Sequence, residues 1–246
     1  MKPFPKHRAS TRWLLLLLAA LSGAQALAQD TLPHDLKYIT FPLAPQRPWT
    51  VGVGITATTM PYEVTEEFHY QVPAVEVQAL RRLGAGFSLQ GRASLQVFQN
   101  YFSIGPRWSA RITDRISAGV GNDVAFWFGS VNVEGFRTRA TGWQNFPNVS
   151  VGYRFGRQVL LTLRAESIMT LDISPRAGDI KIRDDYRLFS GSAYTLLLEQ
   201  PFYGRNKRLA LGLRGIYTSS FWQTWSIFSA LDRNYFYPQF IACLIL

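Results

Sequence analysis

Hydrophobic and polar residues alternate along most of the chain after residue 48, and no long segment repeats with the 3.6-residue period of an α-helix. The stretch that begins at Ile116 shows the pattern well. One of its faces is apolar, with Ile116, Ala118, Val120, Val124, Phe126 and Phe128. The opposite face carries Ser117, Gly119, Gly121, Asp123, Ala125 and Trp127, which are mostly small or polar. A period of two residues predicts β-strands with one apolar face each.

Ten segments share this alternation, and most of them are about 10 to 14 residues long. They are residues 50–59, 72–80, 86–97, 101–112, 116–128, 146–156, 158–169, 188–200, 208–219 and 237–246. Strands of soluble proteins usually have about five or six residues, whereas a tilted strand that crosses a bilayer needs about 9 to 11. The lengths therefore favour an all-β fold, an antiparallel transmembrane β-barrel of about ten strands. An eight-stranded soluble sandwich, which also alternates, is the competing interpretation.

The connections between these segments alternate in length. The short ones follow every second strand, at Arg82–Gly84, Thr113–Arg115, Gly156–Arg157 and Gly204–Lys207. The others are mostly long, at residues 60–71, 129–145, 170–187 and 220–236, with 98–100 as the exception. Bacterial barrels have an even number of strands, short periplasmic turns and longer outer loops. The sequence therefore predicts four long loops on the outer side.

Aromatic residues cluster near the strand ends and predict two belts at the membrane interfaces. The outer belt would hold Phe126, Trp127, Phe128, Tyr217, Phe221, Trp222, Tyr235, Phe236 and Tyr237, and the inner belt Trp49, Tyr153, Phe155, Phe202 and Tyr203. In these patterns residues 49–246 resemble small bacterial outer-membrane β-barrel proteins as a general class. That resemblance implies an outer-membrane location, lipid and lipopolysaccharide as surroundings, and the barrel assembly machinery as a partner. The chain departs from the class at its last residue, Leu246, where an aromatic residue is usual.

The first 28 residues have the layout of a secretory signal peptide. Four basic residues precede the apolar run from Trp13 to Leu21, and Ala26-Leu27-Ala28 supplies a small-x-small cleavage site. Residues 29–48 follow as a proline-rich periplasmic lead-in, with Pro33, Pro42, Pro45 and Pro48. This lead-in either stays extended in the periplasm or folds partly into the barrel lumen as a plug.

Charge and cysteine content exclude several function classes. The signal peptide holds four basic and no acidic residues, so its removal lowers the net charge from +10 to +6. The remaining basic residues form no run of the kind found in nucleic-acid-binding tails. Cys243 is the only cysteine, so an intramolecular disulfide and a cysteine zinc site are both ruled out. We expect no nucleic-acid partner, no metal and no cofactor.

If the apolar faces contact lipid, a set of polar residues must face the lumen. These are Glu76, Gln78, Gln90, Arg92, Arg107, Arg111, Asp123, Arg154, Arg164, Glu166, Glu199 and Arg214. Three strands also share a small-x-Gly-x-Arg phrase, at Ser103–Arg107, Ser150–Arg154 and Ala210–Arg214, in which the glycine could leave room for a neighbouring arginine. Barrels of about eight strands are filled by their own side chains. The charged residues among these therefore predict a polar network that fills the lumen, and their six arginines against four acids make an anion conduit the alternative.

Three functions follow as hypotheses. The first is a non-enzymatic outer-membrane protein, structural or surface-interacting, with a filled, arginine-rich lumen. The second is a narrow pore for small anionic solutes. The third is a hydrolase at the outer rim, where His69 lies beside Glu66 and Glu67 and could act as a base. Asp172, Asp179, Asp184 and Asp185 in the fourth outer loop are interleaved with basic residues, which favours a self-paired loop over a Ca²⁺ site.

Overall fold

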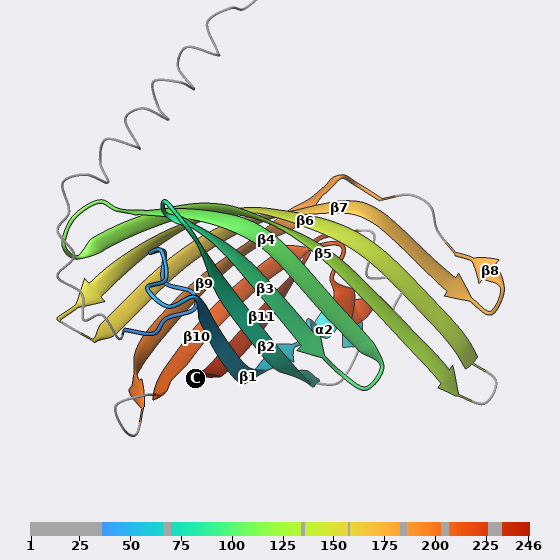
Figure 1. Cartoon of the computed structure of the whole chain (residues 1–246). Coiled ribbons are helices and arrows are strands. Elements are labelled where there is room, and N and C mark those ends of the chain that lie inside the picture. Colours follow the sequence, from blue (N-terminus) through green and yellow to red (C-terminus); the bar gives the residue numbers. More distant parts are fainter. Residues whose placement is uncertain are drawn as a thin grey trace, which may run out of the picture.

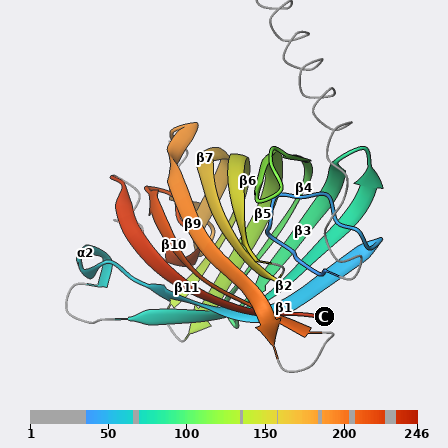
Figure 2. The same ribbon diagram turned by 90° about the vertical axis from the view of Figure 1, so that its left-hand side faces the viewer.

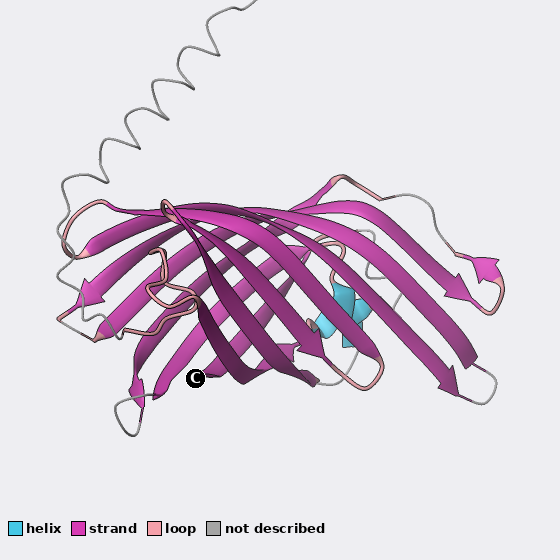
Figure 3. Ribbon diagram, viewed as in Figure 1, coloured by secondary structure: helices cyan, strands magenta, loops and turns pink. Residues whose placement is uncertain are grey.

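A computed structural model of the chain shows ten long antiparallel strands that close into a barrel (Figures 1 and 3). It describes residues 36–65, 70–133, 136–156, 158–182, 186–202, 207–225 and 233–246. The predicted signal peptide lies outside these residues. The strands are β1 (Trp49–Thr59), β2 (Gln71–Gly84), β3 (Phe87–Leu95), β4 (Gln99–Arg111), β5 (Ile116–Val133), β6 (Phe136–Phe155), β7 (Val159–Ala177), β8 (Ile180–Lys181), β9 (Phe189–Phe202), β10 (Lys207–Thr218) and β11 (Tyr235–Ile245). Two short helices are α2 (Tyr62–Thr65) and the 3-10 helix η2 (Trp222–Thr224).

Every barrel strand is hydrogen-bonded on both sides, and the first and last strands pair with each other. In sheet order the strands run β6-β5-β4-β3-β2-β1-β11-β10-β9-β7, and β6 also pairs with β7. The two-residue β8 adds to β7 at Arg176 and Ala177 only. The prediction of a ten-stranded antiparallel barrel is therefore confirmed, and the sandwich interpretation is wrong because a sandwich would leave its two sheets unjoined.

The outside of the barrel wall is apolar. Large exposed hydrophobic residues recur on alternate positions of neighbouring strands, among them Val53, Ile55, Ile104, Val120, Val149, Val151, Leu163, Leu196, Leu213 and Phe240. The intervening side chains are buried inside. Lipid tails can contact such an apolar surface. Closure of the barrel leaves no strand edge unpaired, so the backbone N–H and C=O groups form hydrogen bonds between strands. The chain is an outer-membrane β-barrel protein.

Among the described residues, no helix is long and apolar enough to cross a bilayer.

Two of the four predicted outer loops are wrong, because the strands continue through them (Figure 1). β5 ends at Val133 and β6 starts at Phe136, so most of residues 129–145 is strand. β7 continues to Ala177, and β8 occupies part of the remaining 170–187 segment. The alternation persists here, but the outward side chains are polar, because this part of the sheet stands clear of the hydrocarbon.

The segment before β1 lies inside the end of the barrel where β1 begins and β11 ends (Figure 2). We call this the inner end, because a barrel with an even number of strands has both termini in the periplasm. Residues 36–44 contribute Leu36, Tyr38, Ile39 and Phe41, all buried. Of the two placements open for the proline-rich lead-in, its described part takes the luminal one.

Candidate functional site

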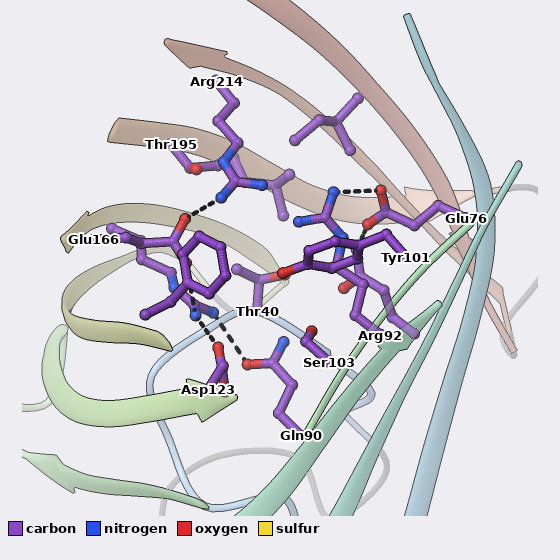
Figure 4. A pocket seen from close by; sticks show the side chains of 15 residues that line it. Thr40, Glu76, Gln90, Arg92, Tyr101, Ser103, Asp123, Glu166, Thr195 and Arg214 are labelled. Atoms are coloured by element: carbon purple, nitrogen blue, oxygen red, sulfur yellow. Dashed lines mark hydrogen bonds and ion pairs between the residues drawn. The ribbon is translucent and has the colours of Figure 1, made fainter. Parts of the chain in front are cut away.

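The lumen holds a chain of ion pairs about halfway along the barrel (Figure 4). Glu166 on β7 binds two arginines, with Oε1 at 2.9 Å from Nη2 of Arg164 and Oε2 at 2.6 Å from Nη2 of Arg214. Arg164 Nη2 also lies 2.5 Å from Oδ2 of Asp123. These side chains come from β5, β7 and β10. The ion pairs therefore connect opposite parts of the wall across the lumen.

A second pair faces the first from β2 and β3. Nη2 of Arg92 lies 2.8 Å from Oε2 of Glu76, and Gln78 donates a hydrogen bond to the other oxygen of that carboxylate. The guanidinium of Arg92 also lies 5.7 Å from the ring centre of Tyr101. Gln78 is directly opposite Arg92 in the β2–β3 register, and Glu76 is the next residue on the same face of β2, so strand pairing brings these three side chains together.

Arg107 connects these ion pairs to residues 36–44, which we call the luminal segment. Its two terminal nitrogens donate to Oε1 of Gln90, at 2.6 Å, and to the carbonyl of Thr40, at 3.0 Å. Gln90 Oε1 accepts a further hydrogen bond from Arg164 Nη1, at 3.1 Å. On the other wall, Oε1 of Glu199 accepts from the backbone amides of Ile39 and Thr40, at 3.1 and 2.8 Å. Residues 39 and 40 are thus held from two sides.

The predicted luminal residues divide into three groups. The first group forms the charged network about halfway along the barrel, which we call the middle layer: Glu76, Arg92, Arg107, Asp123, Arg164, Glu166 and Arg214. Glu199 holds the luminal segment instead. Arg111 and Arg154 lie half-buried at the inner end, apart from the ion pairs of the middle layer, and Arg154 donates to the carbonyl of Asp114 at 2.7 Å. Arg111 is the last residue of β4 and Arg154 the next-to-last residue of β6, at the mouth of the lumen.

The outer half of the lumen is filled by aromatic and aliphatic side chains. This cluster, which we call the outer aromatic cluster, contains Met60, Tyr101, Trp127, Phe146, Ile168, Ile173, Ile216, Phe221, Trp222, Trp225, Tyr235 and Tyr237. Several of these rings had been predicted for the outer interface belt. Trp127, Trp222 and Tyr237 are at most 7% exposed and face inward, so that part of the prediction is wrong. Phe128 and Phe236 are exposed on the outside, where the belt was expected.

Inward-facing glycines make room for this filling. A Cβ at Gly142 would overlap the indole of Trp127, and one at Gly129 would overlap that of Trp225. In the three Gly-x-Arg segments, the glycines leave space for groups other than arginine side chains. Gly152 accommodates Phe41 and Pro42 of the luminal segment, Gly105 the backbone and carboxylate of Asp123, and Gly212 the backbone of β9. The expectation that they admit guanidinium groups is therefore wrong.

Sequence reasoning missed the aromatic filling, although one signal for it was present. The alternation already placed Trp127 on the inward face of its strand, together with the glycines. A large ring on a face of small residues indicates that the small residues accommodate it. By contrast, nothing in the sequence indicated that Trp222 and Trp225, which lie beyond the end of β10, turn back into the lumen.

Between the luminal segment and the outer aromatic cluster, a cavity of about 50 Å³ remains. Its lining includes Glu76, Arg92, Tyr101, Asp123, Glu166 and Arg214 (Figure 4). A smaller cavity of about 20 Å³ lies next to it, under Trp222. These spaces are large enough for a few water molecules. Such waters would accept hydrogen bonds from the Nε atoms of Arg92, Arg164 and Arg214, which are buried without a protein partner. Pockets for organic ligands are several-fold larger, roughly 300 Å³ or more.

Within the described ranges, no group of three or more histidine, cysteine, aspartate or glutamate side chains is arranged to hold a metal ion. His69, Glu66 and Glu67, the residues of the hydrolase hypothesis, lie outside those ranges, as do Asp184 and Asp185.

Comparison with known proteins finds weak similarities among solved structures. No protein-family model and no curated protein sequence matches the chain. Among solved structures, the translocator domain of the autotransporter NalP from Neisseria meningitidis is 7% identical over 96% of this chain and 95% of its own, with a TM-score of 0.46. The KdgM porin, in complex with disordered oligogalacturonate, is 8% identical over 80% and 97%, with a TM-score of 0.38. LpxR from Salmonella typhimurium is 8% identical over 78% and 99%, with a TM-score of 0.34. Such likenesses concern the fold alone.

Proposed function

We propose that this protein is a closed, non-enzymatic outer-membrane barrel that serves a structural or surface-interacting role. The observation that carries the proposal is the continuous filling of the lumen. The luminal segment occupies the inner end, the ion pairs around Glu166 occupy the middle, and the outer aromatic cluster occupies the outer half. A solute would have to displace all three to pass.

The middle layer suits a structural role because each of its carboxylates is already paired with arginine within the protein. Glu166 is bound by two arginines, Glu76 by Arg92, and Asp123 by Arg164. A buried charge is tolerated when it is paired and hydrogen-bonded, and its removal leaves a partner unpaired. Groups arranged to bind a passing solute would be expected to keep more of their hydrogen-bonding capacity free.

Conductance across a planar lipid bilayer tests the proposal. We expect the refolded protein to insert, as judged by its heat-modifiable migration on gels, and to carry no steady current at moderate voltage. Discrete, reproducible current steps from the unmodified protein would contradict a closed lumen.

A second candidate function is a narrow pore for small anionic solutes, which would open only if the luminal segment and the side chains that fill the middle and outer lumen moved aside. Two features favour it: the segment is attached by a few hydrogen bonds through Glu199 and Arg107, and arginines outnumber carboxylates in the middle layer. Glu199→Ala should then raise the frequency of openings, with preference for anions over cations. If the variant carries no more current than the unmodified protein, this pore function is contradicted.

The rim hydrolase stays a prediction that rests on His69 and its two neighbouring glutamates. Hydrolysis of lipid or peptide substrates by the refolded protein, abolished by His69→Ala, would establish it. Lipopolysaccharide and the barrel assembly machinery likewise stay predicted partners, and the second of these is testable by cross-linking during assembly.

A further inference from the structure

The sheet formed by the outer parts of β5, β6 and β7 carries an unusual concentration of positive charge on its outward face. Arg137 and Arg139 alternate on β6 with buried Thr138 and Ala140, so both arginines point outward. Arg176 on β7 lies directly opposite Arg139, and Lys181 on β8 lies directly opposite Arg176. We call these four residues, Arg137, Arg139, Arg176 and Lys181, the outer basic face. Figure 1 shows the sheet that bears it extending beyond the other strands, with β8 at its far end.

The placement of Arg139 and Arg176 is unfavourable for the isolated protein. Directly opposed residues of an antiparallel pair have Cβ atoms about 5 Å apart, and like charges at that distance repel. Arg137, Arg139 and Arg176 take part in none of the ion pairs found between described residues, which lie in the lumen at Glu76, Asp123 and Glu166. Among the described residues, the nearest carboxylates along these strands are Asp172, opposite Trp143, and Asp179, in the turn after β7. An external anion would relieve the repulsion.

Along β6, the residues on the outward face change from aliphatic to aromatic and then to basic toward the outer end. Val149 and Val151 on β6 are exposed and apolar, and Trp143 follows nearer the outer end. Trp143 packs on Phe126 with ring centres 4.8 Å apart, and Phe126, Phe128 and Phe102 continue the row across β5 and β4 at 6.0 and 6.3 Å. Aromatic rows of this kind mark the boundary between hydrocarbon and headgroups.

The spacing then sets the depth of the outer basic face. Arg139 lies four residues beyond Trp143, which is about 13 Å along a strand and about 9 Å along the membrane normal at a tilt of about 45°. Long arginine side chains reach several ångströms further in either direction. The guanidinium groups therefore stand at the level of the lipid headgroups, outside the hydrocarbon and next to it.

We propose that the outer basic face binds a phosphorylated lipid headgroup of the outer leaflet, the chemistry that lipopolysaccharide presents. Arginine forks onto phosphate oxygens with two parallel hydrogen bonds, and paired arginines fit a dianionic group. The acyl chains of the same lipid would cover the aromatic row of Phe102, Phe126, Phe128 and Trp143. The site is independent of the proposed function, because none of its side chains faces the lumen.

Equilibrium binding of a fluorescent lipid A that carries two phosphates, in mixed micelles, tests the site. The test variant is Arg139→Gln/Arg176→Gln, in which both side chains lie on the outside of the sheet. The matched control is Arg115→Gln/Lys207→Gln, which removes the same charge from exposed positions at the inner end. Heat-modifiable gel migration of each variant verifies that the barrel is folded.

We expect the test variant to bind the phosphorylated lipid about tenfold more weakly, because two charge-assisted contacts are lost. The control should bind as the unmodified protein does, and lipid A without phosphates should bind weakly to all three. Equal affinity of test variant and unmodified protein would overturn the proposal. So would equal binding of both lipids, or displacement of the lipid by millimolar inorganic phosphate, which would indicate a site for the free anion.

Discussion

The middle and the outer half of the lumen solve the same packing problem with opposite chemistry. The middle layer is filled by charged side chains whose energy depends on each ion keeping its partner. The outer half is filled by rings that need only the right volume, together with glycines that leave room for them. A buried ion loses several kcal/mol of hydration and depends on its partner to recover it, whereas a buried ring gains roughly in proportion to its area. The middle layer should therefore be specific and intolerant, and the outer half stable and more forgiving.

Glu166→Ala should give the largest effect, because it leaves Arg164 and Arg214 facing each other without the shared carboxylate. We expect unfolding to become easier by about 3–5 kcal/mol. Urea unfolding in lipid vesicles, followed by gel mobility, measures it. Glu63→Ala, at an exposed position of α2, is the control and should stay within about 0.5 kcal/mol. A loss from Glu166→Ala as small as the control's would mean that the ion pairs contribute little.

Trp127→Ala should cost about 3 kcal/mol, since it empties a fully buried site in the outer aromatic cluster. Phe128→Ala, on the neighbouring outward position of β5, is the matched control and should cost less, because lipid replaces the lost contacts. The same unfolding assay applies. If the two changes cost the same, the outer half of the lumen is not tightly packed, and the contrast with the middle layer fails.

Gly152→Ala probes the inner end, where a Cβ would overlap Phe41 and Pro42 of the luminal segment. We expect a loss of about 1–3 kcal/mol and faster proteolysis of that segment. Gly91→Ala on β3 is the control, because the nearest atom to its Cβ would be 3.9 Å away. Unchanged proteolysis of the Gly152 variant would show that the segment adjusts without leaving the barrel.

Arg154→Ala should have the smallest effect, within about 1 kcal/mol, because this side chain lies partly exposed at the inner end and donates to a single carbonyl. It carries the same charge as Arg214 yet lies outside the middle layer. Arg214→Ala, measured alongside it, should cost several-fold more. Similar losses from both changes would show that luminal position has no influence on the importance of an arginine.

The strands and their inward faces were predictable because both depend on a local pattern. A one-residue slip would turn every side chain of a strand to the other face, so the alternation at Ile116–Phe128 fixes which residues enter the lumen. The same rule placed Arg164 and Glu166 inside together. It was not followed into residues 129–145, which were predicted as a loop although β5 and β6 continue through them.

The sequence did not predict which side chains contact each other across the lumen. Glu166 and Arg214 lie 48 residues apart, and their contact depends on the closure of the barrel and on the height of each residue along the tilted wall. The positions of Trp222 and Trp225 depend in turn on space left by Gly129 and Gly142 on other strands.

By itself, the sequence determined a membrane-spanning barrel of ten strands and the side of each strand that faces inward, because alternation and length are properties of single segments. Only the tertiary structure decided which side chains fill the lumen, that residues 36–44 occupy its inner end, and that four basic residues meet on the outer sheet. Those outcomes depend on which segments become neighbours and on how much volume remains between them, and closure of the sheet sets both.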